Sequence, residues 1–163
     1  MTNARLRFLA KRAVGPTTLR SSVPPGSRAK VIEFLISMPL PQADDFCGWL
    51  KHQTDDLAKR ICSEDQRVAW GPARKSINLY LRDLANDRLE GVGISRIRSE
   101  LELPLDSTTM KWLKLNQDSK LPITTIRNLD IDVSQKFQSA AKMAAAKRRM
   151  TVVDLDFEIW GVL

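Results

Sequence analysis

Apolar residues recur at helical spacing along most of the chain. In residues 28–38, Val31, Ile32 and Leu35 fall on one stripe of a helix. Two prolines in MPLPQ (residues 38–42) end this helix. Residues 43–63 repeat the apolar spacing and carry charged residues on the opposite face, which is typical of an amphipathic helix with one solvated side.

The next helices are predicted from the same spacing and from their end signals. Pro72 suits the first position of a helix over 72–86, because proline lacks the N–H group that is unpaired there. A glycine turn follows in RLEGVGIS (residues 88–95), and the apolar residues after it predict a short helix over 94–101.

Three further helices complete the pattern, over 106–116, 133–149 and 152–160. Asp106 or Ser107 can cap the first of them. TVVD (residues 151–154) is typical of a capping box before the last, although its alternation also allows a strand. The chain is therefore predicted to be all-α, a compact bundle of about seven short helices.

The net charge of +7 is concentrated near the start of the chain. Residues 1–30 hold all of the excess, because the rest of the chain carries 19 basic and 19 acidic residues. We therefore expect a basic, flexible arm over 1–27 and a single all-α domain over 28–163. Such an arm suits nucleic acid, and a solubility tail or an organelle transit peptide are the alternatives. The arm residues expected to contact DNA are Arg5, Arg7, Lys11 and Arg12.

Few residues suit metal binding. Two cysteines, Cys47 and Cys62, are too few for a disulfide framework or a four-cysteine metal site. The single histidine, His52, is five residues from Cys47, which is the wrong offset for one helical face. We expect no metal and no cofactor, and the low cysteine content indicates an intracellular, cytoplasmic protein. No apolar stretch approaches the roughly 18 residues of a membrane span. The sequence does not indicate an oligomeric state.

Two glycine-containing turns are candidates to bind phosphate through backbone N–H groups at a helix start. The first is WGPARKSIN (residues 70–78), where Gly71 is followed by Arg74 and Lys75. The second is LEGVG (residues 89–93). Glycine lets a phosphate approach the backbone closely in either turn, and the pattern does not choose between them.

GPARKSINLYL, followed by LPLDSTTMKWL, resembles the helix–hairpin–helix DNA glycosylase superfamily over residues 70–113. In that family a glycine turn precedes a lysine early in the second helix of the hairpin, and an aspartate opens a later helix. Lys75 matches the catalytic lysine, and Asp106 matches the essential aspartate. The resemblance implies a helix–hairpin–helix-like element and a DNA-repair protein that excises a damaged or modified base.

The resemblance also implies a role for each matching residue. Lys75 would attack the sugar carbon of an extruded nucleotide and form a Schiff base. Asp106 would stabilise the positive charge that develops on the sugar, or position the nucleophile. The residues expected to contact DNA around this pair are Gly71, Arg74, Asn78, Arg82, Trp70 and Trp112, the two tryptophans by stacking on a base or wedging the duplex.

Other functions stay open on the same residues. The chain can be a non-catalytic nucleic-acid-binding module, or a helical protein-interaction protein with a basic tail. In either case Asp106 is an ordinary helix cap and both tryptophans belong to the core. A steep fall of DNA affinity with salt separates nucleic-acid binding from the protein-interaction hypothesis.

Overall fold

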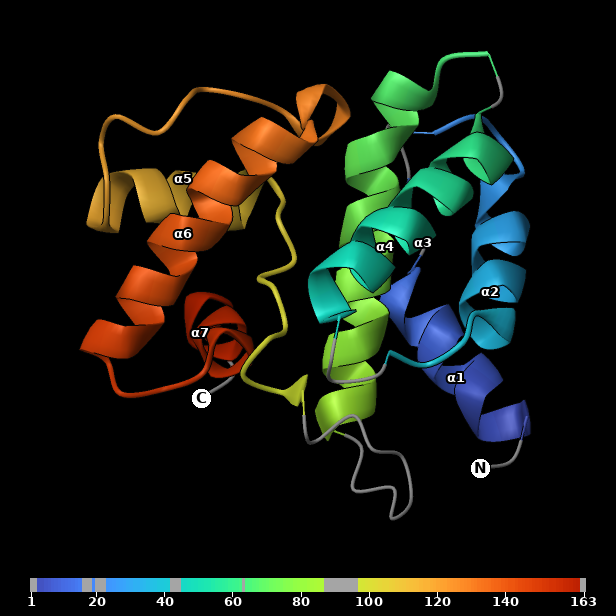
Figure 1. The fold of residues 1–163 in the computed structure, drawn as a ribbon, viewed down its shortest axis with the longest axis horizontal. Coiled ribbons are helices and arrows are strands. Elements are labelled where there is room, and N and C mark those ends of the chain that lie inside the picture. The colour runs from blue at the N-terminus through green and yellow to red at the C-terminus, as the bar shows by residue number, and fades with distance from the viewer. Residues whose placement is uncertain are drawn as a thin grey trace.

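The structure, a computed structural model, describes residues 3–15, 19, 23–41, 45–62, 64–86 and 97–161. This part of the chain is helical and contains no strand, as the sequence predicts (Figure 1). The helices are α1 (Asn3–Ala13), α2 (Ser27–Ser37), α3 (Phe46–Ile61), α4 (Gln66–Asn86), α5 (Ser107–Asn116), α6 (Ile131–Lys147) and α7 (Val152–Ile159), with a short 3₁₀ helix, η3 (Ile126–Asn128).

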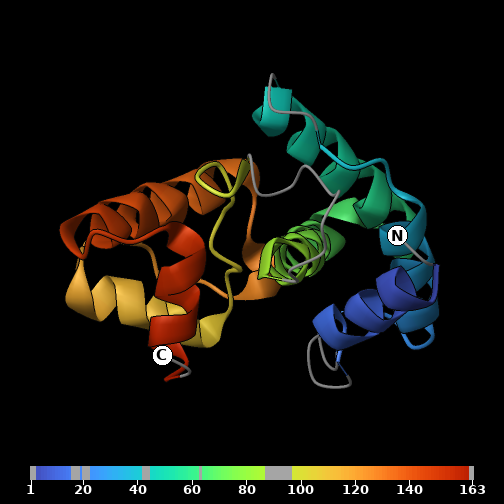
Figure 2. The ribbon, with the colours of Figure 1, turned by 90° about the horizontal axis from the view of Figure 1, so that it is seen from below.

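Helix α4 lies at the centre of the molecule. Helices α1, α2 and α3 pack on one side of it, and α5, α6 and α7 lie on the other (Figure 1). Figure 2 shows α4 nearly end-on between these two groups. Each group has its own cluster of buried apolar side chains, and the extended segment 101–106 passes between the groups. The segment therefore brings residues from the second half of the chain beside α4.

Helix α4 begins earlier than the sequence predicts. It starts at Gln66, and both Gly71 and Pro72 lie inside it, so the glycine turn expected at residue 71 is absent. Proline costs a helix one backbone hydrogen bond, but α4 is packed along its length, with Ala69, Gly71 and Pro72 all buried. Packing against neighbouring elements outweighs the local preference of proline.

The expectation of a flexible arm is wrong for residues 3–14. They form α1 and the turn after it, and Leu9 and Val14 are fully buried in the first apolar cluster. The Arg28 guanidinium donates to the carbonyl oxygen of Val14 at 2.7 Å and ties this segment to α2. The basic residues of α1 therefore sit on a fixed helix at the surface of the domain.

The segment after α4 differs from the predicted helix over 94–101. In its described part, residues 97–100 form a turn, and residues 101–106 are extended with Leu103 fully buried. The side-chain amide of Gln138 accepts from the Leu103 N–H at 2.9 Å and donates to the Leu103 carbonyl at 2.8 Å. This pair of bonds satisfies a buried backbone that has no helical partner. The second glycine turn, at residues 91–93, lies outside the described residues.

The end signals of the last helices are confirmed. Asp106 is the N-cap of α5 and accepts from the backbone N–H groups of Thr108 and Thr109. Thr151 and Asp154 form a reciprocal capping box at the start of α7. Residues 152–159 are therefore a helix and not a strand.

Candidate functional site: the Lys75–Asp106 cleft

Lys75 and Asp106 meet although they are 31 residues apart in the sequence. The Lys75 ammonium nitrogen lies 3.1 Å from Oδ2 of Asp106. Their side chains are 14% and 16% exposed, respectively. Lys75 projects from the middle of α4, and the extended segment 101–106 delivers Asp106 to it.

The two carboxylate oxygens of Asp106 have different tasks. Oδ1 accepts from the N–H groups of Thr108 and Thr109, at 2.9 and 3.0 Å, and so holds the start of α5. Oδ2 faces the amine of Lys75. The helix cap therefore fixes the carboxylate in place and leaves its second oxygen paired with the amine.

The pair lies in a cleft of about 590 Å³ between α1, α4, the start of α5 and α7. Its lining comprises Arg12, Ala13, Lys75, Leu79, Arg82, Pro104, Asp106, Ser107, Thr108, Asp156, Phe157 and Trp160. We call this hollow the Lys75–Asp106 cleft. A volume of this size is in the range of small-molecule sites, roughly 300–1,000 Å³.

A chain of ion pairs crosses one wall of the cleft. Arg12 Nε lies 2.8 Å from Asp83, Arg82 bonds the other oxygen of Asp83 at 2.9 Å, and Arg82 also bonds Asp156 at 2.6 Å. Asp83 and Asp156 are almost fully buried, with side chains 1% exposed. The network joins α1, α4 and α7, so it holds the wall rigidly in place.

Asp156 is a buried carboxyl in this wall with a shifted pKa. Burial raises the pKa of its carboxyl, and the hydrogen bond and charge of Arg82 oppose this only in part. The neighbouring charge of Asp106 raises the pKa further. Oδ1 of Asp156 has no hydrogen-bond partner within the described residues. For Arg82, burial lowers the pKa, but the charges of Asp83 and Asp156 outweigh this and raise it.

Two aromatic side chains, one from α7 and one from the C-cap directly after it, complete the cleft. Phe157 lies under the guanidinium of Arg82, 5.3 Å from it, and Trp160 is half exposed. Neither these residues nor Asp156 were expected from the sequence. A spacing of four between Asp156 and Trp160 puts both on one helical face, but only the packing of α7 against α4 shows that this face meets Lys75.

Two residues expected at the DNA are buried elsewhere. Arg74 bonds Glu102 through two nitrogens, at 2.9 and 2.7 Å, and donates to Thr54 at 3.1 Å. Asn78 donates to the same carboxylate at 3.1 Å. Arg74 and Asn78 are only 8% and 3% exposed. They hold the extended segment against α4, which corrects their assignment as DNA contacts.

Gly71 does not bind phosphate, because its N–H lies inside a helix. A Cβ atom at this position would lie 1.9 Å from the Ile126 carbonyl oxygen, so the glycine allows the close approach of η3 to α4.

Trp70 lines a different cavity from the Lys75–Asp106 cleft. Trp112 packs on the second apolar cluster, with the guanidinium of Arg148 over its ring at 4.9 Å.

Helix α1 contributes one basic residue to the cleft and carries three more on its surface. Arg12 lines it directly with a side chain that is 52% exposed. Arg5, Arg7 and Lys11 are exposed on the same helix. A polyanion that reached the cleft along α1 would therefore meet positive charge before it met Lys75.

No cluster of three or more potential metal ligands occurs in the described ranges. None of the helices described here has the length and apolar character needed to cross a bilayer. Comparison with protein-family models, with curated proteins and with solved structures finds no match for this chain.

Proposed function

We propose that the protein binds nucleic acid along α1 and cleaves the bond between a damaged or modified base and its sugar in the Lys75–Asp106 cleft. The observation that carries the proposal is the 3.1 Å approach of the Lys75 amine to Asp106 inside a cleft of about 590 Å³. The resemblance of residues 70–113 to helix–hairpin–helix DNA glycosylases assigns the reaction to this pair. The reduced cysteines Cys47 and Cys62 favour an intracellular setting for it.

The pair suits nucleophilic displacement at a sugar carbon. The Lys75 ammonium first gives a proton to water. Its neutral amine then forms a bond to C1′, and the bond from C1′ to the base breaks with its electron pair leaving on the base, which takes up a proton from water. Asp106 accepts the proton that the attacking nitrogen loses. Opening of the sugar ring at the C1′–O4′ bond then gives a Schiff base, and O4′ takes the proton held by Asp106 to become a hydroxyl group on C4′.

Residues around the pair suit an extruded nucleotide. Trp160 offers a half-exposed ring at the mouth of the cleft, on which a base can stack. Arg12 offers a guanidinium to a neighbouring phosphate. Extrusion is needed because the sugar carbon of a stacked nucleotide cannot reach a nucleophile inside a cleft.

The test is borohydride trapping on a DNA duplex with one abasic site. Borohydride reduces a Schiff base to a stable amine, so the wild-type protein is expected to form a covalent adduct with DNA. Lys75→Gln should abolish the adduct. Lys142→Gln is the control, because Lys142 is an exposed lysine on α6 that lies outside the cleft. Trapping that is equal in Lys75→Gln and wild type would remove Lys75 from the mechanism.

A non-catalytic nucleic-acid-binding module is the second candidate. The observation that favours it is that Lys75 and Asp106 satisfy one another, and that Asp106 also caps α5. Both candidates predict binding that weakens steeply with salt. Replacing the exposed Arg7 and Lys11 by glutamine should lower the salt slope by about 0.9 for each phosphate that is no longer neutralised. Salt-dependent binding by a wild-type protein that never traps would select the second candidate.

A further inference from the structure

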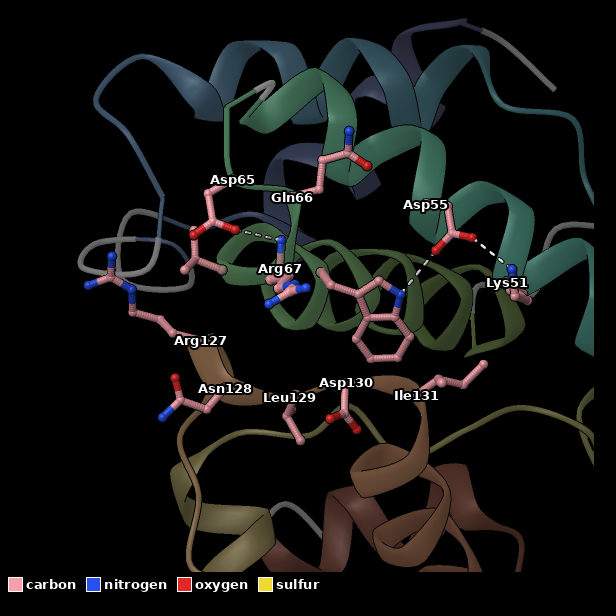
Figure 3. A pocket seen from close by; sticks show the side chains of 12 residues that line it. Lys51, Asp55, Asp65, Gln66, Arg67, Arg127, Asn128, Leu129, Asp130 and Ile131 are labelled. Carbon is pink, nitrogen blue, oxygen red and sulfur yellow. Dashed lines mark hydrogen bonds and ion pairs between the residues drawn. The ribbon is translucent and has the colours of Figure 1, made fainter.

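A second cavity lies beside the first turns of α4, with a volume of about 730 Å³ (Figure 3). It opens between α3, the start of α4 and the junction of η3 with α6. We call it the Trp70 cavity, and its lining is Lys51, Asp55, Asp65, Gln66, Arg67, Val68, Trp70, Arg127, Asn128, Leu129, Asp130 and Ile131. It shares no residue with the Lys75–Asp106 cleft.

The side chains of Arg67, Arg127 and Asn128 are uncommitted. None of them makes a hydrogen bond or ion pair within the described part of the chain, and all three residues are exposed. Arg67 comes from α4 and Arg127 from η3, so two of the elements that line the cavity each contribute an arginine. Guanidinium groups that are free to bond are the preferred partners of phosphate.

The acids of the cavity are engaged with local partners. Asp65 accepts from the backbone N–H of Arg67 at 3.1 Å, and Asp130 accepts from that of Val133 at 2.8 Å, each at the start of a helix. Asp55 accepts from the Trp70 indole N–H at 3.1 Å and from Lys51 at 3.0 Å. The formal charges of the lining balance, but Arg67 and Arg127 are its two charged side chains without a partner among the described residues.

The two ends of the cavity differ in chemistry. Figure 3 shows Arg127 and Asn128 at one end, and Asp55 with Lys51 at the other. The indole of Trp70 is held in position by its bond to Asp55 and by the Arg74 guanidinium, which lies 5.5 Å from the ring centroid. Apolar side chains line the space near it, from Val68, Leu129 and Ile131. A planar ring can pack there without distorting the site.

We propose that the Trp70 cavity binds a nucleotide, with its phosphate at Arg67, Arg127 and Asn128 and its base against Trp70. The carboxylates of Asp55 and Asp130 lie in the same cavity and can accept hydrogen bonds from the N–H groups of the base. A bare phosphate leaves the apolar end empty, and an uncharged ring leaves both arginines without a partner. A nucleotide uses both ends, whether it is free or belongs to a single strand.

The binding test uses titration calorimetry with adenosine 5′-monophosphate, adenosine, inorganic phosphate and a short single-stranded oligonucleotide. The monophosphate is expected to bind more tightly than adenosine or phosphate. The double variant Arg67→Gln, Arg127→Gln should weaken it about tenfold or more, because hydrogen bonds to charged groups are lost. The matched control is Lys142→Gln, Lys147→Gln, which removes the same charge from exposed positions on α6 and should leave the affinity unchanged.

Each outcome bears on the proposal. Binding of the oligonucleotide alone, weakened in Arg67→Gln, Arg127→Gln, identifies a nucleotide within a strand as the ligand. If neither the monophosphate nor the oligonucleotide binds at millimolar concentration, the proposal is overturned. Equal affinity of wild type and the double variant Arg67→Gln, Arg127→Gln for the monophosphate overturns it as well. The proposal does not rest on the reaction at Lys75, because Lys75→Gln should bind the monophosphate like wild type while it loses trapping.

Discussion

Replacing Gly71 by alanine tests the contact between α4 and η3. In an ordinary helix interior this change is stabilising by about 1 kcal/mol, because alanine has the higher helix propensity. In α4 the new Cβ would lie 1.9 Å from the Ile126 carbonyl oxygen and 3.0 Å from Cβ of Leu129. The carbonyl oxygen belongs to the backbone and cannot rotate away, so η3 has to move.

The expected result is a net loss of stability. Forcing an extra methyl group into a packed site costs about 1–3 kcal/mol, and the displaced η3 also loosens Leu129, which is 3% exposed. The upper end of this range, about 3 kcal/mol, applies because a backbone carbonyl has to move. After about 1 kcal/mol of helix propensity is subtracted, we expect the free energy of unfolding to fall by about 2 kcal/mol. For a chain of this size the melting temperature should then drop by about 4–8 °C.

Urea denaturation, followed by tryptophan fluorescence, measures the effect. The midpoint should fall with little change in slope. Because Gly71 is next to Trp70 and η3 forms one wall of the Trp70 cavity, nucleotide binding should weaken in the same variant at temperatures where it stays folded. A midpoint that rises, as for an exposed helical glycine, would refute the close approach of η3 to α4.

Three further predictions concern other parts of the structure. Leu9→Ala should cost about 2–5 kcal/mol in urea denaturation because Leu9 is fully buried, whereas Phe8→Ala, at a position 52% exposed, should cost far less; equal small effects would contradict the packing of α1. Burial raises the pKa of Asp156, so the native state holds its proton more tightly than the unfolded state and stability is lost as pH rises above about 4. Asp156→Asn should therefore gain stability relative to wild type with rising pH, and parallel pH profiles would contradict this. Asp106→Asn keeps the helix cap but loses the charge that faces Lys75, so stability should fall by about 1–3 kcal/mol while trapping collapses. A fully active Asp106→Asn variant would reduce this residue to a cap.

The fold class and most helices could be predicted because a helix with one buried face has apolar residues at helical spacing in the sequence. The capping residues Asp106 and Thr151 mark the starts of α5 and α7 in the same local way. The start of α4 could not be predicted, because Pro72 locally favours a helix that begins there, and packing overrides this preference. The extended segment around Leu103 depends on the side chain of Gln138, which is 35 residues away.

The candidate site was predictable only in part. The sequence pointed to Lys75 and Asp106 through a resemblance, and the fold places them together. Arg74 is predicted to contact DNA because it flanks the glycine turn expected at residue 71, but its partner Glu102 is 28 residues away and takes it into the interior. Asp156 joins the cleft through long-range packing of α7, for which the sequence carries no local signal.

The central claim is that the amine of Lys75 reacts with a nucleotide in the cleft. The most direct measurement is to trap the wild-type protein on abasic DNA with borohydride, digest the adduct and identify the modified residue by mass spectrometry. The account predicts that the sugar remnant is attached to the side chain of Lys75. Attachment at the N-terminal amine or at other lysines, with Lys75 unmodified, would contradict it.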